Sequence, residues 1–191
     1  MSIRVHPLKG ISVSTPYLVP HAAALAFFKL KRDWAIQAVE KQKERYKSVP
    51  KADPQQIDLM RKQAKAELPL RLEMLADRYS FLYNRVTIKH NATNWGSCST
   101  KGNINLNLNI VRLPSALRDY ILLHELCHLR HHDHGQAFHL LLEHVCTDNL
   151  LKLVDDGDLM ARELAGAAAR SRARYPIDHV CTKAIKNYPL I

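Results

Sequence analysis

The sequence predicts an α+β fold, in which a small β-sheet packs against long helices. Residues 103–110, NINLNLNI, alternate strictly between asparagine and aliphatic residues, which is the pattern of a strand with one buried face. Residues 21–47 and 55–83 instead place apolar residues at helical spacing among charged ones. A few short strands beside long helices are typical of the α+β class.

The N-terminal elements follow from short-range patterns. Alternating apolar residues predict a β-hairpin over residues 1–15, and Pro20 suits the first turn of the helix that follows. A polar, proline-bounded connection at residues 48–54 leads to the second helical stretch, which Pro69 is expected to kink or break. Together the two helical stretches form a helical part at residues 20–83.

A core part is predicted at residues 85–154, and it begins with a short strand at residues 85–90. The strongly alternating strand comes next along the chain. Pro114 and Ser115 then start a helix, and another helix runs from about residue 136 to residue 154. We therefore expect one domain over residues 1–154.

Residues 155–191 are predicted to be a C-terminal helix and tail. The acidic, glycine-containing segment at residues 155–158 reads as a helix breaker. An alanine-rich helix follows to about Arg174, and the residues after Pro176 are expected to be loosely attached.

The composition is that of a globular protein inside the cell. The chain has 191 residues, of which 47% are apolar, and no apolar run approaches the roughly 20 residues of a membrane span. The first ten residues lack the apolar core of a secretory signal. Its four cysteines form no C-x-x-C pair, so neither a disulfide framework nor a thiolate zinc knuckle is expected. We expect a cytoplasmic protein with reduced thiols and no membrane partner.

The chain is strongly basic, with a formal net charge of +10 and a pI near 9.6. Such a field attracts phosphate backbones or acidic partners. The basic residues are spread over the predicted helices between Lys29 and Lys65 and over a C-terminal cluster, and no aromatic residues interleave with them. A solvated basic face and a nucleic-acid partner are therefore the two interpretations.

The segment His124-Glu125-Leu126-Cys127-His128 is the main functional signal. Residues four apart lie on the same face of a helix, so His124 and His128 can direct their imidazoles at one ion. Two neutral histidines and a carboxylate that is not itself a ligand are what a catalytic zinc requires. The same short string also occurs by chance, with both histidines merely solvated or in the core.

A catalytic zinc usually has three protein ligands, so a third donor is needed. His131 shares the helical face but lies roughly 10 Å along the axis from His124, too far for one ion on a straight helix. Asp133 and Gly135 supply turn chemistry after the helix, and His134 lies in that turn. His134 is therefore the predicted third ligand. The alternative third ligands are His139 and then Glu143. His131, His132 and His144 are expected to belong to a solvated helix end.

The motifs around this segment, taken together, resemble those of a known family. They are Trp95-Gly96-Ser97-Cys98-Ser99, Gly102-Asn103-Ile104, Leu113-Pro114, Tyr120, His124 to Leu129, His134-Gly135 and Phe138. This combination is similar to the YgjP-like zinc metallopeptidases, which resemble SprT-like and WLM proteases, the minimal zincins, in their core. The resemblance covers roughly residues 1–147. It implies a small antiparallel or mixed sheet packed on the HExxH helix, with additional long N-terminal helices.

The resemblance also implies the chemistry. His124, His128 and His134 would bind zinc, and Glu125 would be the catalytic base that activates a zinc-bound water for peptide hydrolysis. Family members commonly have an aromatic residue, often tryptophan, where this chain has His139, which makes His139 an auxiliary group or a rival ligand. They also commonly have a further strand before the position of Met1, so an unpaired edge is expected on the hairpin.

Several residues near the motif are candidates for auxiliary roles. Tyr120, Trp95 and the other groups of residues 94–97 are candidates for stabilising an oxyanion, and Tyr120 is equally suited to be a core residue with a satisfied hydroxyl. Cys127 and Cys98 are expected to pack rather than to act as nucleophiles.

The alternating strand at residues 103–110 is a candidate for holding the substrate. Its asparagine face lacks the charges that often protect an edge strand, so an extended peptide could add to it near Asn105 and Asn107. The alternative is an interior strand whose asparagines cap neighbouring loops.

Three functions are consistent with the sequence. The first is a zinc-dependent peptidase acting on proteins or peptides. The second is an SprT-like, nucleic-acid-associated module that uses the basic surface. The third is a non-catalytic zinc-binding domain, which would not need Glu125 and would usually close the fourth position of the ion.

Overall fold

The structure, a computed structural model, describes residues 1–6, 10–17, 19–48 and 53–191. The chain divides into two compact units, Met1–Lys51 and Ala52–Ile191. The expected domain at residues 1–154 is thus shared between two units, and residues 155–191 belong to the second. The turn of the hairpin and most of the connection at residues 48–54 lie outside the described residues. Both units combine helices with short strands, so the class is α+β as predicted.

The first unit consists of a β-hairpin and one helix. Strands β1 (Ser2–His6) and β2 (Gly10–Ser14) pair antiparallel, with Ile3 opposite Val13. Helix α1 (His21–Ser48) contacts both strands and buries Ala35 and Val39. The expected hairpin and the expected helix are therefore both present.

The second unit contains a mixed three-stranded sheet. Its strands are β3 (Arg85–Lys89), β4 (Gly96–Cys98) and β5 (Asn103–Asn107), in the order β3-β5-β4. β5 is parallel to β3 and antiparallel to β4, so it is the central strand. The expected strand at residues 103–110 is too long, because the Asn107 side chain accepts a hydrogen bond from Asn109 N and starts a 3-10 turn, η1 (Leu108–Arg112).

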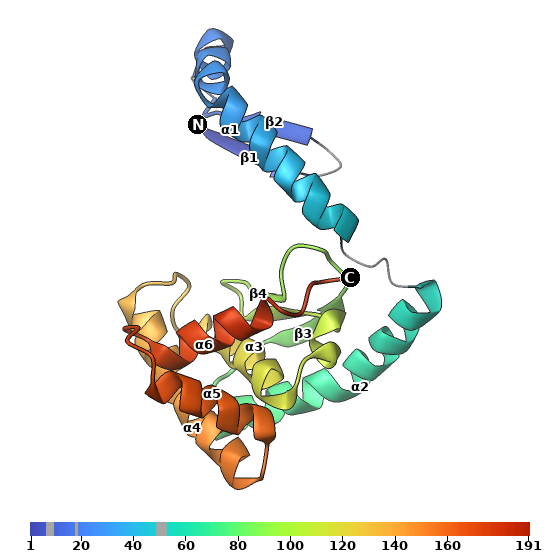
Figure 1. Cartoon of the computed structure of the whole chain (residues 1–191), viewed down its shortest axis with the longest axis vertical. Coiled ribbons are helices and arrows are strands. Elements are labelled where there is room, and N and C mark those ends of the chain that lie inside the picture. The colour runs from blue at the N-terminus through green and yellow to red at the C-terminus, as the bar shows by residue number, and fades with distance from the viewer. Residues whose placement is uncertain (7–9, 18, 49–52) are drawn as a thin grey trace. The chain divides into compact units, whose positions relative to one another are not determined.

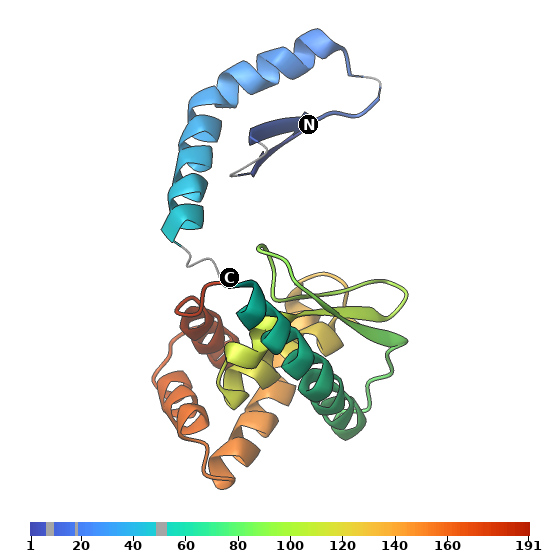
Figure 2. The same cartoon turned by 90° about the vertical axis from the view of Figure 1, so that its right-hand side faces the viewer.

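Five helices complete this unit, and α3 lies between the sheet and the C-terminal helices (Figures 1 and 2). They are α2 (Pro54–Arg78), α3 (Ser115–Cys127), α4 (Gln136–Asp155), α5 (Leu159–Ala169) and α6 (Pro176–Ile185). α3 contacts every other helix of this unit and also β4. Leu117, Leu122 and Leu126 of α3 are fully buried, so this helix forms the centre of the core. None of the helices in the described ranges is long and apolar enough to cross a membrane.

Helix α2 does not break at Pro69. It runs from Pro54 to Arg78 with the proline inside, and the Asp53 side chain accepts from Gln55 N at its start. A proline removes one helical hydrogen bond, but Leu68 and Leu72 on either side of it are fully buried. Packing of this face against the core therefore holds the helix together.

The residues after Pro176 are not a loosely attached tail. They form α6, whose Ile177 and Cys181 side chains are buried. The carboxylate of Glu143 on α4 accepts hydrogen bonds from Ile177 N at 2.8 Å and from Asp178 N at 3.1 Å. A carboxylate at a helix N-terminus stabilises it, so α4 fixes the start of α6.

A buried polar network positions α3. Asp119, which is 1% exposed, accepts from Arg71 Nε at 2.8 Å and from Arg71 Nη2 at 2.5 Å. Asn149 Nδ2 donates to the same carboxylate at 2.8 Å. Because Arg71 lies on α2 and Asn149 on α4, the network joins three helices and fixes the helix that holds the motif.

Candidate metal centre

Three histidines converge at the C-terminal end of α3. His124 lies in the last turn of that helix, His128 follows its last residue, and His134 lies in the loop before α4. Each offers one ring nitrogen, and these nitrogens all lie within 4.8 Å of one another. His124 Nε2 and His134 Nε2 are 3.1 Å apart. Two ligands of a tetrahedral zinc, at about 2.05 Å each, would be about 3.3 Å apart, so the spacing suits one ion.

The local sequence explains how the chain brings the three rings together. His128 keeps right-handed helical geometry, and its N–H still donates to His124 O at 3.3 Å. The chain then turns, and the Asp133 side chain accepts from Gly135 N at 3.2 Å. This turn returns His134 to the face of α3 that presents the other two histidines.

Neighbouring groups fix the orientation of the rings. His128 Nδ1 lies 3.0 Å from His131 O, and since a carbonyl only accepts, Nδ1 carries the hydrogen and Nε2 keeps its lone pair. Phe138, fully buried, stacks on His128 with ring centroids 4.5 Å apart. Its ring meets His124 and His134 nearly edge-on, at 5.0 and 4.8 Å. The rings are therefore held in place by packing as well as by hydrogen bonds.

The protonation state of the histidines suits metal binding. Burial, together with the neighbouring His128 and His134, lowers the pKa of His124 to about 4. Burial also lowers the pKa of His128. Both imidazoles are thus neutral at physiological pH, which is the form that binds a metal ion.

Glu125, which follows His124 on α3, is also buried and is 5% exposed. One of its carboxylate oxygens, Oε2, has no hydrogen-bond partner among the described residues. Burial raises the pKa of Glu125 to about 8. Its side chain packs on Gly96 of β4, where an added Cβ would lie 2.5 Å from Glu125 Oε1. Only a glycine at position 96 leaves room for this carboxylate.

Residues 50–150 match the family model described as YgjP-like, metallopeptidase domain. The chain belongs to the YgjP-like family. No curated protein and no solved structure matches the chain. The match begins at the end of the first unit and ends within α4, so residues 1–49 of the first unit, α5 and α6 lie outside it. The resemblance inferred from sequence motifs, over residues 1–147, extended further toward the N-terminus.

The other candidate ligands of this YgjP-like chain lie outside the cluster that the described residues form. His139, the first reserve ligand, has its Nδ1 3.0 Å from Asp178 Oδ2. Glu143, the second reserve, instead holds the start of α6. His131 contributes only its backbone carbonyl, to His128, and the cluster among the described residues contains neither His132 nor His144.

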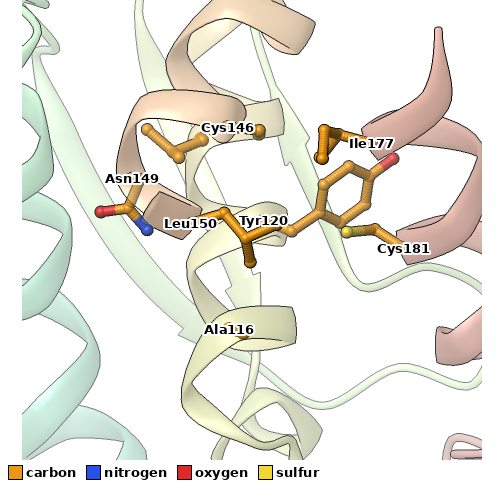
Figure 3. Close-up of a pocket in the computed structure, with 8 residues that line it drawn as sticks. Ala116, Tyr120, Cys146, Asn149, Leu150, Ile177 and Cys181 are labelled. Atoms are coloured by element: carbon orange, nitrogen blue, oxygen red, sulfur yellow. The ribbon is translucent and has the colours of Figure 1, made fainter. Parts of the chain in front are cut away.

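Tyr120 hydrogen-bonds to α6 through its hydroxyl, although its ring centroid lies 6.2 Å from that of His124. Its ring points toward α6 and lines a small cavity with Cys146, Ile177 and Cys181 (Figure 3). The hydroxyl lies 2.5 Å from Asp178 Oδ1 and 3.1 Å from Thr182 Oγ1. Of the two expected roles, the structure has the buried residue with a satisfied hydroxyl.

Trp95, directly before β4, is partly buried and contributes to the sheet. The Trp95 side chain packs against the core, and its carbonyl accepts from Asn107 N at 2.8 Å. Cys98 and Cys127 are poor nucleophiles, because burial raises the pKa of Cys98 to about 11 and that of Cys127 to about 12.

The prediction that a substrate adds to the strand of Asn105 and Asn107 is wrong. Both edges of β5 are already paired, by β3 and by β4. Asn105 Nδ2 donates to Ser97 Oγ at 3.1 Å, and Asn107 Nδ2 donates to Asn91 O at 2.8 Å. The asparagine face thus holds the neighbouring loops, which is the alternative stated for this strand.

Sequence reasoning missed Gly96 and Asp178. The motif around Trp95 contained a signal for the first, since an isolated glycine in a strand often marks a close approach. Asp178 gave no signal, because its contacts with α3 and α4 arise only from the packing of α6.

Proposed function

We propose that the chain is a zinc-dependent peptidase that hydrolyses peptide bonds in proteins or peptides. The observation that supports this most strongly is Glu125, a buried carboxylate with an unpartnered oxygen beside three converging histidines. A structural zinc site usually has four protein ligands and needs no base. Three ligands in the described cluster, with a carboxylate next to them, are the pattern of a catalytic site. An HExxH helix packed on a small mixed sheet is consistent with a zincin-like minimal fold.

The residues present fit zinc. Neutral imidazoles suit this borderline-soft ion, and the 3.1 Å between His124 Nε2 and His134 Nε2 is close to the separation of two ligands of one tetrahedral ion. His124, His128 and His134 would hold it. When bound, zinc supplies a Lewis acid that polarises the scissile carbonyl and favours ionisation of water at neutral pH.

Glu125 would act as the general base. Burial raises the pKa of Glu125, so its ionised carboxylate is a stronger base than an exposed one; in that form it would accept a proton from the attacking water and later donate it to the leaving amine. Gly96 allows the carboxylate to occupy this position. Phe138 keeps one side of the site apolar, which excludes bulk water and strengthens electrostatic interactions there.

We propose that the substrate pairs with β4, which is an edge strand. Trp95 and Ser99, which flank β4, make backbone hydrogen bonds to β5. Because such bonds alternate along an antiparallel pair, Gly96 and Cys98 direct their backbone groups outward. An extended peptide added there would lie next to Glu125. Cys98→Pro removes one outward donor and should keep zinc but reduce cleavage; normal cleavage would exclude pairing at β4.

The experiment that tests the function is digestion of reduced, unfolded casein by the zinc-loaded protein. Cleavage should stop when a chelator removes the metal and return when zinc is added. Preparation of Glu125→Gln by the same route controls for a contaminating protease. A zinc-loaded protein that cleaves no casein would contradict the proposal.

A second candidate function, nucleic-acid binding by the first unit, has a specific observation in its favour. Residues 1–51 contain 10 Lys and Arg against 3 Asp and Glu, a formal charge of +7 out of +10 for the whole chain. Along α1 the side chains of Lys29, Lys31, Arg32, Lys41 and Lys43 are all exposed. Such a concentration attracts phosphate backbones, and it would bring the peptidase to proteins bound to nucleic acid.

A salt titration of binding to duplex DNA tests this second function. Affinity should fall steeply and linearly with salt on logarithmic axes. Replacing Lys29, Arg32 and Lys43 together by Ala should flatten the slope. Replacing the exposed Lys65, Lys101 and Lys186 of the second unit is the matched control, and an equal effect of both triple variants would contradict a role for the first unit.

A further inference from the structure

Asp178, on a helix outside the matched metallopeptidase domain, reaches two elements of the metal centre. Its Oδ1 lies 2.5 Å from the hydroxyl of Tyr120, which is one turn before His124 on α3. Its Oδ2 lies 3.0 Å from Nδ1 of His139, which follows Phe138 on α4. One carboxylate of α6 thus contacts both helices that flank the histidine cluster.

The surroundings of Asp178 hold it firmly. The Glu143 carboxylate accepts from its backbone N–H and from that of Ile177. Tyr175, at the start of α6, stacks on the His139 ring with centroids 4.9 Å apart and an interplanar angle of 18°. The same helix therefore supplies both the carboxylate and the aromatic face that contact His139.

His139 lies next to the cluster of His124, His128 and His134 but is not part of it among the described residues. Its ring centroid is 6.3 Å from that of His134. Nδ1 is buried and forms no hydrogen bond of good geometry among the described residues, and Asp178 Oδ2, at 3.0 Å, is an acceptor beside it. The side chain is nevertheless 26% exposed, so the exposed part of the ring lies away from Nδ1.

We propose that His139 is a substrate-binding residue and Asp178 its positioning residue, so that α6 completes the active site. In this arrangement the hydrogen is on Nδ1, and the carboxylate of Asp178 accepts it. Nε2 then presents a lone pair, which accepts a hydrogen bond from a peptide N–H of the substrate. This inference rests on the proposed peptidase function, and it assigns a role to a segment that the family match does not include.

Two variants and a control test the proposal. His139→Phe keeps an aromatic ring for stacking on Tyr175 but has no nitrogen, and Asp178→Ala removes the carboxylate. Because a neutral hydrogen bond contributes modestly, each should lower kcat/KM for casein peptides by about 3- to 10-fold, with zinc content unchanged. Thr182→Val, which removes only the second partner of the Tyr120 hydroxyl, controls for disturbed packing of α6 and should leave kcat/KM unchanged.

A second measurement does not depend on activity. Nitrogen-15 spectra of the metal-free protein report which ring nitrogen of His139 carries the hydrogen, and His139→Phe identifies the signal. The wild type should have the hydrogen on Nδ1, and Asp178→Ala should move the ring toward the other tautomer. N-methylation of a cleaved peptide, one position at a time, removes one N–H from the substrate. At one position this should slow cleavage by the wild type but not cleavage by His139→Phe.

The outcomes separate this inference from the proposed function. Equal kcat/KM for the wild type and His139→Phe, in a protein that cleaves casein, would overturn the inference alone. So would an unchanged tautomer in Asp178→Ala. A zinc-loaded wild type that cleaves nothing would overturn the peptidase function and the inference with it. If Asp178→Ala fails to fold, His139→Phe decides.

Discussion

Helix α3 buries two carboxylates, Asp119 and Glu125, in opposite surroundings. Asp119 is 1% exposed and accepts hydrogen bonds from Arg71 and Asn149. Glu125 is 5% exposed, and its Oε2 has no partner among the described residues. A buried charge with partners holds a structure together, whereas one without partners costs stability. Asp119 therefore serves the fold, whereas the surroundings of Glu125 agree with the role of general base that we propose for it.

The largest effect is expected for Glu125→Gln on catalysis. The amide is nearly isosteric with the carboxylate but cannot accept a proton from water, so casein hydrolysis should fall by about 10²- to 10⁴-fold. Zinc content should remain that of the wild type. Loss of metal in this variant would mean that Glu125 is a metal ligand rather than the general base.

Asp119→Ala should have the largest effect on stability. It leaves Arg71 and Asn149 without their shared acceptor, and breaking a buried pair costs about 3–5 kcal/mol. Urea denaturation measures the loss. Asp58→Ala is the matched control, because its ion pairs with Arg61 and Lys62 are exposed and should contribute at most about 1 kcal/mol. Equal losses in the two variants would mean that the Asp119 network does not stabilise the fold.

Gly96→Ala tests whether β4 positions Glu125. An added Cβ would lie 2.5 Å from Glu125 Oε1 and 2.7 Å from its Cγ, so the carboxylate must move. A displacement of about 1 Å can cost about 100-fold in rate, and a loss of that size in kcat is expected. Gly166→Ala, on α5, meets only the flexible end of Arg170 and should leave kcat unchanged. A fully active Gly96→Ala would show that the carboxylate works from more than one position.

The smallest effect is a gain in stability for metal-free Glu125→Gln. Burial raises the pKa of Glu125 to about 8, above the roughly 4.3 of an unfolded glutamate. The stability that this group contributes is therefore present below about pH 4 and is lost as the pH rises through 8. In chelator at pH 8 the variant should be more stable than the wild type by about 1–3 kcal/mol. The gap should close toward pH 4, and a gap independent of pH would contradict the buried carboxylate.

Much of the site could be predicted from local spacing. His124 and His128 follow from helical geometry, and His134 follows from the limited reach of a straight helix and the turn chemistry of Asp133 and Gly135. Pattern alone could not distinguish an edge strand from a central one, since alternation reports only which face is buried. For this reason the sequence points to β5 as the substrate strand, whereas the edge strand of the sheet is β4, at which we propose that the substrate pairs.

The contacts of α6 were beyond sequence reasoning for a different reason. Asp178 meets Tyr120 and His139 only after α4, α5 and α6 have packed together, and no local signal reports such long-range packing. The helix itself is short, and its polar segment before Pro176 resembles a linker. Its start is stabilised by Glu143, which the sequence had suggested as a metal ligand.

The most direct test of the metal centre is a zinc titration of the wild type, His134→Ala and His131→Ala against a competing chelator. The wild type should bind about one zinc per chain. Changes in groups that only support a ligand cost about 10- to 100-fold in metal affinity, so loss of the ligand His134 should cost more than about 100-fold. His131→Ala keeps the backbone carbonyl that His128 contacts and should bind zinc as the wild type does. If His131→Ala loses the metal and His134→Ala keeps it, the three-histidine centre is wrong.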